Sequence, residues 1–353
     1  MKFLDGQAPY IIAEIGANHN GDMAMARQLI DVAHGLGADC AKFQSWDVNI
    51  FSGKSYRDNY FLGDDYRDRK DYTLHQIVEA YAVSPEQLRD LRGYCREKGI
   101  DFASTPFETA QIDTLIELDA PFIKIASMDV TSDYLLRHAG ATGKPIVLST
   151  GMATLGEIEH AIRTLENEGN RDICVLHCIA IYPTPDRLMN LRNIETLRRA
   201  FGYPVGFSDH SRGPELSLAA IALGAVVIEK HFTLDKTMFG WDHGISMDPA
   251  EMKVLIEGAR RVHVALGTAQ RVVGVEEMEK RTAFRRSVIA ARPIAKGMPI
   301  AAADLTYRRP GTGVAPNDAH LLIGRMALND IPYNEFVRLE DTGPATQSVR
   351  KQV

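Results

Sequence analysis

Eight short apolar runs rich in β-branched residues recur between residues 10 and 231, and helical patterns separate them. The runs are 10–15, 39–44, 100–105, 121–127, 145–150, 173–178, 204–209 and 226–231. The helical patterns, several of which start at Ser, Thr or Asp and stop at Gly, include 23–37, 84–99, 109–119, 156–169 and 248–267. Strands that alternate with helices predict a parallel sheet, and eight such pairs match the (β/α)8 TIM barrel, an α/β fold. A doubly wound sheet is the alternative.

The pattern changes after Gly267, where the periodicity fades into a charged stretch, 273–286. From residue 287 the chain has short strand-like runs with frequent Gly and Pro, which predicts a compact β-rich module. We therefore expect a barrel domain at 1–267, a linker at 268–286, the small module at 287–342 and a disordered tail at 343–353.

A long segment, 47–73, lies between the second strand and its helix. Loops of this length in compact domains are usually functional or disordered insertions. The Tyr, Arg and Asp content of the segment suits a lid over a polyhydroxylated ligand, and a solvated surface excursion is the competing interpretation.

Charge and cysteine usage narrow the class of protein. The net charge of −6 gives no broad basic field, which argues against nucleic acid or an anionic membrane as a partner. No apolar run of signal-peptide length opens the chain, and no stretch of about 18 apolar residues occurs, so we expect a cytoplasmic protein. The cysteines fall in apolar patterns without zinc-knuckle spacing, which indicates reduced, packed thiols. They are Cys40, Cys95, Cys174 and Cys178.

Two consecutive predicted strands each lead into a histidine, His210 and His231. Parallel strands joined by a helix would place both rings at the same rim of the barrel, which predicts an open metal site with positions left for water and substrate. Imidazole does not select among Mn, Zn, Co and Fe. Asp209 and Glu229 come from the same strands and could orient the rings or ligate. Two hydrogen-bonded core histidines are the competing interpretation.

Two lysines, Lys42 and Lys124, stand among apolar strand residues, where an unpaired ammonium would be costly. One interpretation is an internal ion pair with Glu14 or another barrel carboxylate. The other is a phosphate or carboxylate ligand at the barrel mouth. Hydroxyl groups at strand ends could join such a ligand: Thr105, Ser127, Ser149 and Thr150.

Further polar residues follow the strand ends. Glu14, opposite the lysines, is a candidate proton acceptor or hydroxyl binder. The turn 16–21 is less informative, because Asn and Gly occur in turns for backbone reasons. Asp242, beyond the eighth strand, could contact sugar hydroxyls near the predicted metal. Tyr182 precedes a proline and is compatible with a purely structural role.

In chain order, the strings AEIGANHNGD, GADCAKFQ, STPF, KIAS, LSTGM, LHC-x3-YPTP, GFSDHSRG and IEKHFTLDK resemble the sialic acid synthase family. This family comprises the N-acetylneuraminate synthases and their legionaminate and pseudaminate relatives. The later run from RRSVIAARPIAKG to RRPGTG resembles the C-terminal antifreeze-like (SAF) domain of that family. The resemblance therefore covers nearly the whole chain.

The resemblance implies a transferase that condenses phosphoenolpyruvate with an open-chain N-acetylated amino sugar, N-acetylmannosamine or a related diamino hexose, to give a nonulosonic acid and phosphate. It implies a divalent metal on His210 and His231 that polarises the sugar aldehyde, with Mn²⁺ expected first and Mg²⁺ or Co²⁺ as alternatives. The family positions that hold phosphoenolpyruvate match Lys42, Thr105, Lys124, Ser127, Ser149, Tyr182 and Ser208. Catalytic positions match Glu14, Asp242 and the two histidines. Sugar-binding positions match Gln44, Asp129, Asp242, Phe284 and Arg309.

In this family the C-terminal domain of one subunit caps the barrel of its partner, so the resemblance implies a domain-exchanged homodimer. Arg309 matches the arginine that reaches the acyl group of the sugar. Two positions depart from the family pattern: Ala180 replaces an Asn of N-acetylneuraminate synthases, and Asp129 replaces a frequent Glu. These departures leave neuraminate-, legionaminate- and pseudaminate-type substrates open.

Three other functions are compatible with a barrel of this kind. Another phosphoenolpyruvate-dependent synthase of 3-deoxy sugar acids, or a metal-dependent aldolase, would not require the C-terminal module. An aldolase would use pyruvate and release no phosphate. A non-catalytic carbohydrate-binding barrel would have no need of an open metal position.

Overall fold

The computed structural model describes residues 8–54 and 72–344, which fall into two compact units divided after Gly267. Most of the predicted lid, 55–71, and most of the predicted tail, 345–353, lie outside the described residues.

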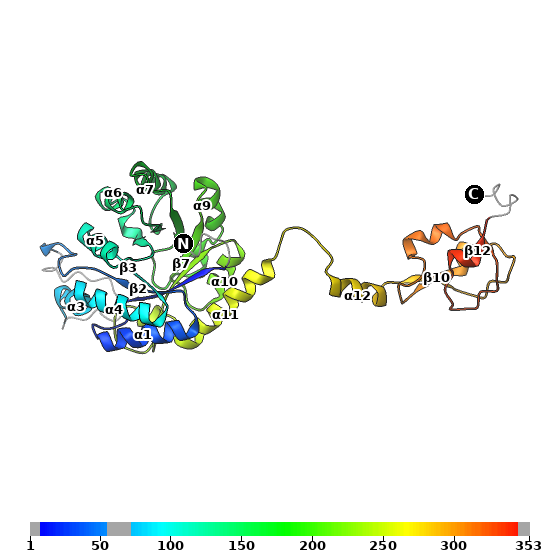
Figure 1. The fold of residues 1–353 in the computed structure, drawn as a ribbon, viewed down its shortest axis with the longest axis horizontal. Helices are drawn as coiled ribbons and strands as arrows, with labels where there is room; N and C mark the ends of the chain where they lie inside the picture. The colour runs from blue at the N-terminus through cyan, green and yellow to red at the C-terminus, as the bar shows by residue number, and fades with distance from the viewer. Residues whose placement is uncertain (1–7, 55–71, 345–353) are drawn as a thin grey trace. The chain divides into compact units, whose positions relative to one another are not determined.

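The first unit is built on a parallel sheet of eight strands (Figure 1). The strands are β1 Tyr10–Gly16, β2 Cys40–Gln44, β3 Asp101–Thr105, β4 Ile123–Ile125, β5 Ile146–Ser149, β6 Ile173–Cys178, β7 Val205–Asp209 and β8 Val227–His231. Their order is β3-β2-β1-β8-β7-β6-β5-β4, so sequence neighbours lie side by side, and the edge strands β3 and β4 are in contact. The sheet is nearly closed into a barrel, which confirms the predicted fold and excludes the doubly wound alternative.

Helices alternate with the strands and cover the outside of the sheet (Figure 1). They are α1 Met23–Leu36, α3 Leu74–Tyr81, α4 Pro85–Lys98, α5 Thr109–Glu117, α6 Asp133–Ala141, α7 Leu155–Asn167, α8 Asp186–Met189, α9 Asn193–Phe201, α10 Glu215–Ala222 and α11 Pro249–Leu266, with 3-10 helices η2 Ser127–Asp129 and η3 His243–Ile245. Predicted start signals act as N-caps: Ser84 and Asp248 complete capping boxes. Among the described residues, no helix is both long and apolar enough to cross a membrane.

Strand alternation divides the side chains of the sheet between two cores. On β1, Ile11, Ala13 and Ile15 belong to the large core between strands and helices. Tyr10 and Ile12 belong to a second core that fills the interior of the barrel toward the amino ends of the strands. The same parity on the other strands leaves the inward positions nearer the carboxyl ends for the polar residues.

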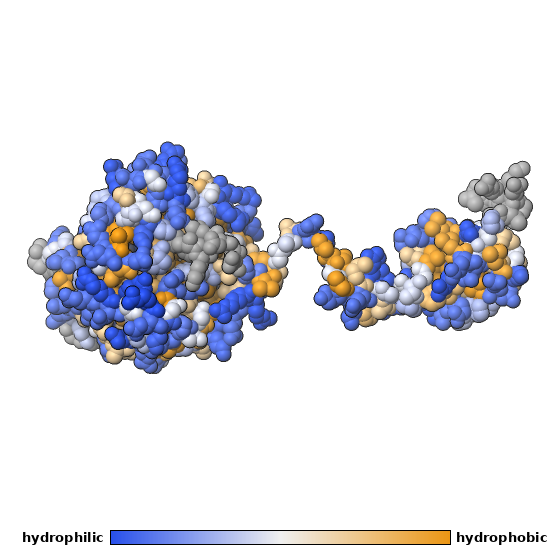
Figure 2. Space-filling view, in the orientation of Figure 1, coloured by the Kyte–Doolittle hydropathy of each residue, from blue (hydrophilic) through white to orange (hydrophobic). Residues whose placement is uncertain are grey.

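The second unit contains α12 Val275–Phe284, which occupies most of the stretch predicted as a linker. Two antiparallel strand pairs follow, β9 Ser287–Ala290 with β10 Leu305–Arg308, and β11 Met326–Ala327 with β12 Thr342–Gly343. The 3-10 helices are η4 Ala302–Asp304, η5 Pro316–Leu321 and η6 Leu339–Asp341. The unit has a small apolar core of its own that includes Val288, Leu322 and Val337. Figure 2 shows apolar residues on the visible face of this unit.

Candidate functional site

The inward positions nearest the carboxyl ends of the strands form a polar layer above the apolar barrel core. Its members are Glu14, Lys42, Gln44, Thr105, Lys124, Ser149, Ser208, Glu229 and His231. All of them except the partly buried Gln44 are buried. Parallel strands bring their carboxyl ends to one rim, so residues far apart in sequence meet here. Most of the predicted phosphoenolpyruvate-binding residues therefore lie together.

Lys42 is held by two carboxylates. Its Nζ lies 2.5 Å from Glu14 Oε2 and 3.6 Å from Glu229 Oε2. It also donates a hydrogen bond of 2.9 Å to Thr105 Oγ1. Burial alone would lower the pKa of this ammonium, but the two carboxylates outweigh burial and raise the pKa. The internal ion pair with Glu14 is present, and the two carboxylates favour the charged form of Lys42.

Glu229 connects the two lysines. Its Oε1 lies 3.8 Å from Lys124 Nζ and accepts a hydrogen bond of 2.9 Å from Ser208 Oγ. Lys124 donates a hydrogen bond of 2.7 Å to Ser149 Oγ. Burial acts to raise the pKa of Glu229, but Lys124 and Lys42 lower it to about 2. We expected Glu229 to support the histidines, and the structure shows instead that its carboxylate accepts a hydrogen bond from Ser208 and forms ion pairs with the two lysines.

Three polar side chains converge above Gly16. A Cβ at this position would lie 3.2 Å from both Gln44 Nε2 and Glu14 Oε1 and 3.8 Å from Asp242 Oδ2. Gly16 has a φ of +53°, so both its crowded surroundings and its backbone conformation favour glycine. Gln44 Nε2 donates a hydrogen bond of 2.9 Å to Glu14 Oε1. Burial raises the pKa of Glu14, with Lys42 opposing and Glu229 adding to that shift.

The rings of His210 and His231 lie side by side, with centroids 5.5 Å apart. His210 Nδ1 donates a hydrogen bond of 2.8 Å to the carbonyl of Ile179, so Nε2 carries the lone pair of the neutral ring. His231 Nδ1 is buried, has no hydrogen-bond partner among the described residues, and lies 3.5 Å from Asp242 Oδ2. Burial, followed by the neighbouring His210, lowers the pKa of His231 well below its ordinary value.

This histidine pair fits a divalent metal. A neutral imidazole is the form that ligates, and the carbonyl contact of His210 is the usual way a metal-binding ring is oriented. Within residues 8–54 and 72–344, no group of three or more His, Cys, Asp and Glu side chains is arranged to hold a metal ion. An open catalytic site leaves coordination positions for water and substrate beside its protein ligands. The ring of Tyr182 lies 4.1 Å from that of His210, centroid to centroid.

The prediction that Asp209 orients or ligates near the histidines is wrong. Its carboxylate forms an ion pair of 3.0 Å with Lys230 Nζ and accepts hydrogen bonds from Ser211 and Ser217. Ser217 lies on α10, so Asp209 faces the helices and not the barrel interior. Strand alternation is the reason, because Ser208, the preceding residue, faces inward.

Cys178, which the sequence indicated as a packed thiol, lies inside the site. Its Sγ is 3.9 Å from His210 Nδ1 and 3.5 Å from Ser127 Oγ. Ser127 Oγ also accepts a hydrogen bond of 2.9 Å from the N–H of Gly151. A Cβ on Gly151 would lie 3.1 Å from that of Ala180, so the small residue at 180 packs against a tight turn. Alternate residues of β6, Cys174 and Leu176, face the barrel interior, and this alternation is the sequence signal that Cys178 also faces inward.

The predicted sugar-binding residues lie in two units. Asp129 stands in η2, accepts a hydrogen bond from Ser132, and has a buried Oδ2 without a hydrogen-bond partner in the described chain. Burial raises the pKa of this carboxyl. Phe284 and Arg309 lie in the second unit, where Arg309 Nε donates a hydrogen bond of 2.8 Å to the carbonyl of Phe284. The guanidinium carbon lies 5.7 Å from the centroid of the phenyl ring, so these two residues form one exposed surface.

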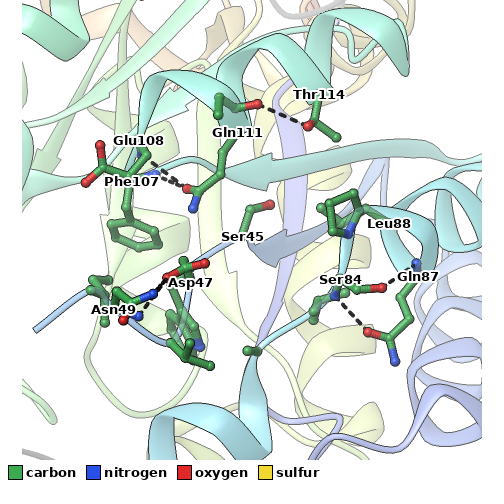
Figure 3. A pocket seen from close by; sticks show the side chains of 17 residues that line it. Ser45, Asp47, Asn49, Ser84, Gln87, Leu88, Phe107, Glu108, Gln111 and Thr114 are labelled. Atoms are coloured by element: carbon green, nitrogen blue, oxygen red, sulfur yellow. Dashed lines mark hydrogen bonds between the residues drawn. The ribbon is translucent and has the colours of Figure 1, made fainter. Parts of the chain in front are cut away.

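A pocket of about 690 Å³ lies elsewhere on the barrel unit, between segments 45–50, 82–88 and 107–114 (Figure 3). None of the predicted site residues lines it. Two of its glutamines serve as caps: Gln111 Oε1 accepts the N–H of Phe107, and Gln87 Oε1 accepts that of Ser84. The residues that line the pocket differ from those of the polar layer inside the barrel.

A barrel with a buried charged layer and two adjoining histidines at its rim has the character of an enzyme of the (β/α)8 class. The model of the NeuB family matches residues 29–271, and the model of the SAF domain matches residues 285–341. The chain therefore belongs to the NeuB family and carries a SAF domain at its C-terminal end. The predicted membership of the sialic acid synthase family, and with it the prediction of an enzyme, is confirmed.

Individual relatives agree with this assignment. The chain is 38% identical to the N,N'-diacetyllegionaminic acid synthase of Campylobacter jejuni, over 93% of this chain and 98% of the relative. It is 33% identical to the N-acetylneuraminate-9-phosphate synthase of Homo sapiens, over 96% and 94%. The crystal structure of an N-acetylneuraminic acid synthetase from Leptospira borgpetersenii matches with a TM-score of 0.69 at 32% identity, over 78% of this chain and 90% of that one.

Proposed function

We propose that this protein condenses phosphoenolpyruvate with an open-chain N-acetylated amino sugar to give a nonulosonic acid and inorganic phosphate. The observation that carries the proposal is the pair of buried lysines, Lys42 and Lys124, beside two adjacent histidines at the rim of a NeuB-family barrel. Two ammonium groups at the barrel mouth suit a substrate that has both a phosphate and a carboxylate.

The lysines would bind phosphoenolpyruvate through its anionic groups. Lys42 and Lys124 already hold hydrogen bonds to Thr105 and Ser149, so the ammonium groups and hydroxyls are fixed before a ligand arrives. Preorganised donors of this type stabilise developing charge without reorganisation. Ser127, Ser208 and Tyr182 would complete this part of the site.

The sugar would lie toward Gly16, where Glu14, Gln44 and Asp242 converge. His210 and His231 would hold a divalent cation, with Mn²⁺ proposed first, and such a cation supplies Lewis acidity at the aldehyde oxygen. Glu14 is the candidate proton carrier, because burial raises its pKa toward the range useful for acid and base catalysis.

The reaction that we propose forms one carbon–carbon bond and one carbon–oxygen bond, the latter to water, and breaks one carbon–oxygen bond, to phosphate. C3 of phosphoenolpyruvate attacks the aldehyde carbon, water adds at C2, and the bond between C2 and the bridging phosphate oxygen then breaks. The products are a 2-keto acid, longer than the sugar by three carbons, and phosphate. The residues of the rim would act by positioning and by charge stabilisation.

We further propose that the protein works as a homodimer in which the C-terminal unit of one subunit covers the barrel of the other. Phe284 and Arg309 form one exposed surface, and apolar side chains such as Leu321, Ile323 and Leu328 are exposed on the same unit. Exposed apolar groups on a small domain are typical of an interaction surface. Cytoplasmic location stays a prediction.

One assay tests the function. The protein is stripped with a chelator, reloaded with Mn²⁺, Mg²⁺ or Co²⁺, and incubated with phosphoenolpyruvate and a panel of N-acetylated amino sugars that includes N-acetylmannosamine and a diacetamido hexose. Release of phosphate together with a 2-keto acid, only when sugar is present, is the expected result. Phosphate release without sugar, or turnover of pyruvate, would refute the proposal. Equal activity of the stripped protein would refute the metal requirement.

A further inference from the structure

The turn that follows β1, residues 17–21, is bonded through its side chains to the loop that follows β8, residues 232–246. Asn18 is fully buried, and its Nδ2 donates hydrogen bonds of 2.9 Å to the carbonyl of Phe232 and 2.8 Å to Ser246 Oγ. Phe232 directly follows His231. Asn18 therefore contacts the loop at both its beginning and its end.

Ser246 passes this connection on to Asp242. Its hydroxyl donates a hydrogen bond of 2.6 Å to the carbonyl of Asp242, and its backbone N–H donates another of 3.1 Å to the same oxygen. The side chain of Asp242 reaches the convergence point above Gly16 and lies 3.5 Å from His231 Nδ1. A continuous chain of hydrogen bonds thus runs from Asn18 through Ser246 to the backbone of Asp242.

A second connection holds the middle of the loop. Asn20 Nδ2 donates a hydrogen bond of 3.1 Å to the carbonyl of Phe239. Asn20 Oδ1 accepts one of 3.0 Å from His243 Nε2, and His243 Nδ1 accepts one of 2.6 Å from Thr233 Oγ1. The loop that carries Asp242 is therefore fixed to the β1 turn at several points.

We propose that Asn18 is a positioning residue that acts through Ser246 to hold Asp242 at the sugar end of the site. The inference rests on the proposed function, in which Asp242 binds the sugar. Buried chains of hydrogen bonds restrict the arrangement of the groups that they join. A displacement of about 1 Å in a substrate-positioning group can reduce turnover by about a hundredfold. The two lysines that would bind phosphoenolpyruvate stand on β2 and β4, whereas the side-chain hydrogen bonds of Asn18 run to the loop after β8.

The test compares Asn18→Ala and Ser246→Ala with wild type in steady-state kinetics in which each substrate is varied separately. The sugar is the one that wild type turns over fastest. We expect kcat/KM for the sugar to fall at least about tenfold in both variants, while KM for phosphoenolpyruvate changes less than about twofold. The double variant should lose little more than Asn18→Ala alone, because both substitutions break the same chain.

Asn170→Ala is the matched control. Asn170 is buried, donates a hydrogen bond of 2.8 Å to the carbonyl of Lys144 and accepts one of 3.0 Å from Asp172 N–H, just before β6. It thus ties backbone segments together as Asn18 does, but at the opposite end of the barrel. We expect Asn170→Ala to lower the melting temperature without changing KM for the sugar.

Several results would overturn the inference. Asn18→Ala or Ser246→Ala could lower kcat/KM for both substrates in equal proportion. Asn170→Ala could lower kcat/KM for the sugar as much as Asn18→Ala does. Strictly additive losses in the double variant would also contradict it. Should Asn18→Ala fail to fold, Ser246→Ala, which removes only a hydroxyl, decides alone. Absence of turnover in wild type would overturn the proposed function and this inference with it. If wild type turns over but the variants affect the kinetics of both substrates equally, only the positioning role is overturned.

Discussion

Replacing Glu229 by Gln removes the carboxylate that joins the two buried lysines. Glu229 lies 3.6 Å from Lys42 Nζ and 3.8 Å from Lys124 Nζ. Burial acts to raise its pKa, but the two ammonium groups lower it from 4.5 to about 2. The difference between those two values corresponds to about 3 kcal/mol of stability at neutral pH. Breaking a buried pair by removing one partner costs about the same, 3–5 kcal/mol.

The pH dependence of this loss has a definite sign. Because the folded-state pKa of Glu229 lies below the unfolded-state value, the folded chain binds fewer protons in the interval between them. The stabilisation is complete above about pH 4.5 and is lost as the pH falls toward 2. The stability gap between wild type and Glu229→Gln should therefore narrow as the pH is lowered from about 5 to about 3.

Urea unfolding followed by tryptophan fluorescence measures this gap for the barrel alone, because both tryptophans, Trp46 and Trp241, belong to the barrel unit. Glu14→Gln is the matched control at a neighbouring carboxylate. Burial raises the pKa of Glu14, so the folded state already resists its ionisation, and we expect a smaller loss at pH 7. Two results would refute the stabilisation of ionised Glu229 by the two lysines. One is an equal loss of unfolding free energy in the two variants, and the other is a difference between wild type and Glu229→Gln that does not change with pH.

Other substitutions probe separate parts of the site. His231→Ala should abolish turnover and metal binding measured by calorimetry while circular dichroism stays native, and an unfolded variant would favour the core-histidine interpretation. Gly16→Ala should cost about 1–3 kcal/mol in unfolding measurements because its φ is +53°. Its methyl group would also crowd Glu14 and should raise KM for the sugar more than KM for phosphoenolpyruvate. A larger rise in KM for phosphoenolpyruvate would contradict the placement of the sugar. Arg309→Ala should weaken sugar binding more than phosphoenolpyruvate binding, and equal effects on the two KM values would count against an acyl contact from the partner subunit.

The barrel could be predicted because its local signals agree with its packing. Gly37 and Gly99 end α1 and α4 in the left-handed conformation, and β2 and β3 begin within three residues of them. The helix α12 could not be predicted, since helical periodicity reflects a buried face and α12 buries no residue within the described chain. Its apolar side chains Val275 and Met278 are exposed.

The site was predictable where residue type and strand parity agree. Lysine is unusual in strands, and Lys42 and Lys124 occupy inward positions, so their identity alone predicts a charged site at the barrel mouth. Asp209 shows the limit of reading proximity in sequence as proximity in space. It directly precedes a histidine, but a side chain one position away on a strand faces the other side of the sheet. Asn18 could not be recognised, because an Asn in a turn has the same local signature whether it shapes only that turn or bonds to a distant loop.

The closeness of His210 and His231 follows from how β7 and β8 are joined just before the two rings. Two successive residue pairs are in register there, Ser208 with Glu229 and Asp209 with Lys230. The first pair forms a hydrogen bond of 2.9 Å inside the barrel, and the second forms an ion pair of 3.0 Å on the helix side. A slip of one residue between the strands would turn each of these side chains to the opposite face and leave buried charges unpaired. The register is therefore fixed from both faces, and the spacing of the two imidazoles depends on residues that would not themselves touch a metal or a substrate.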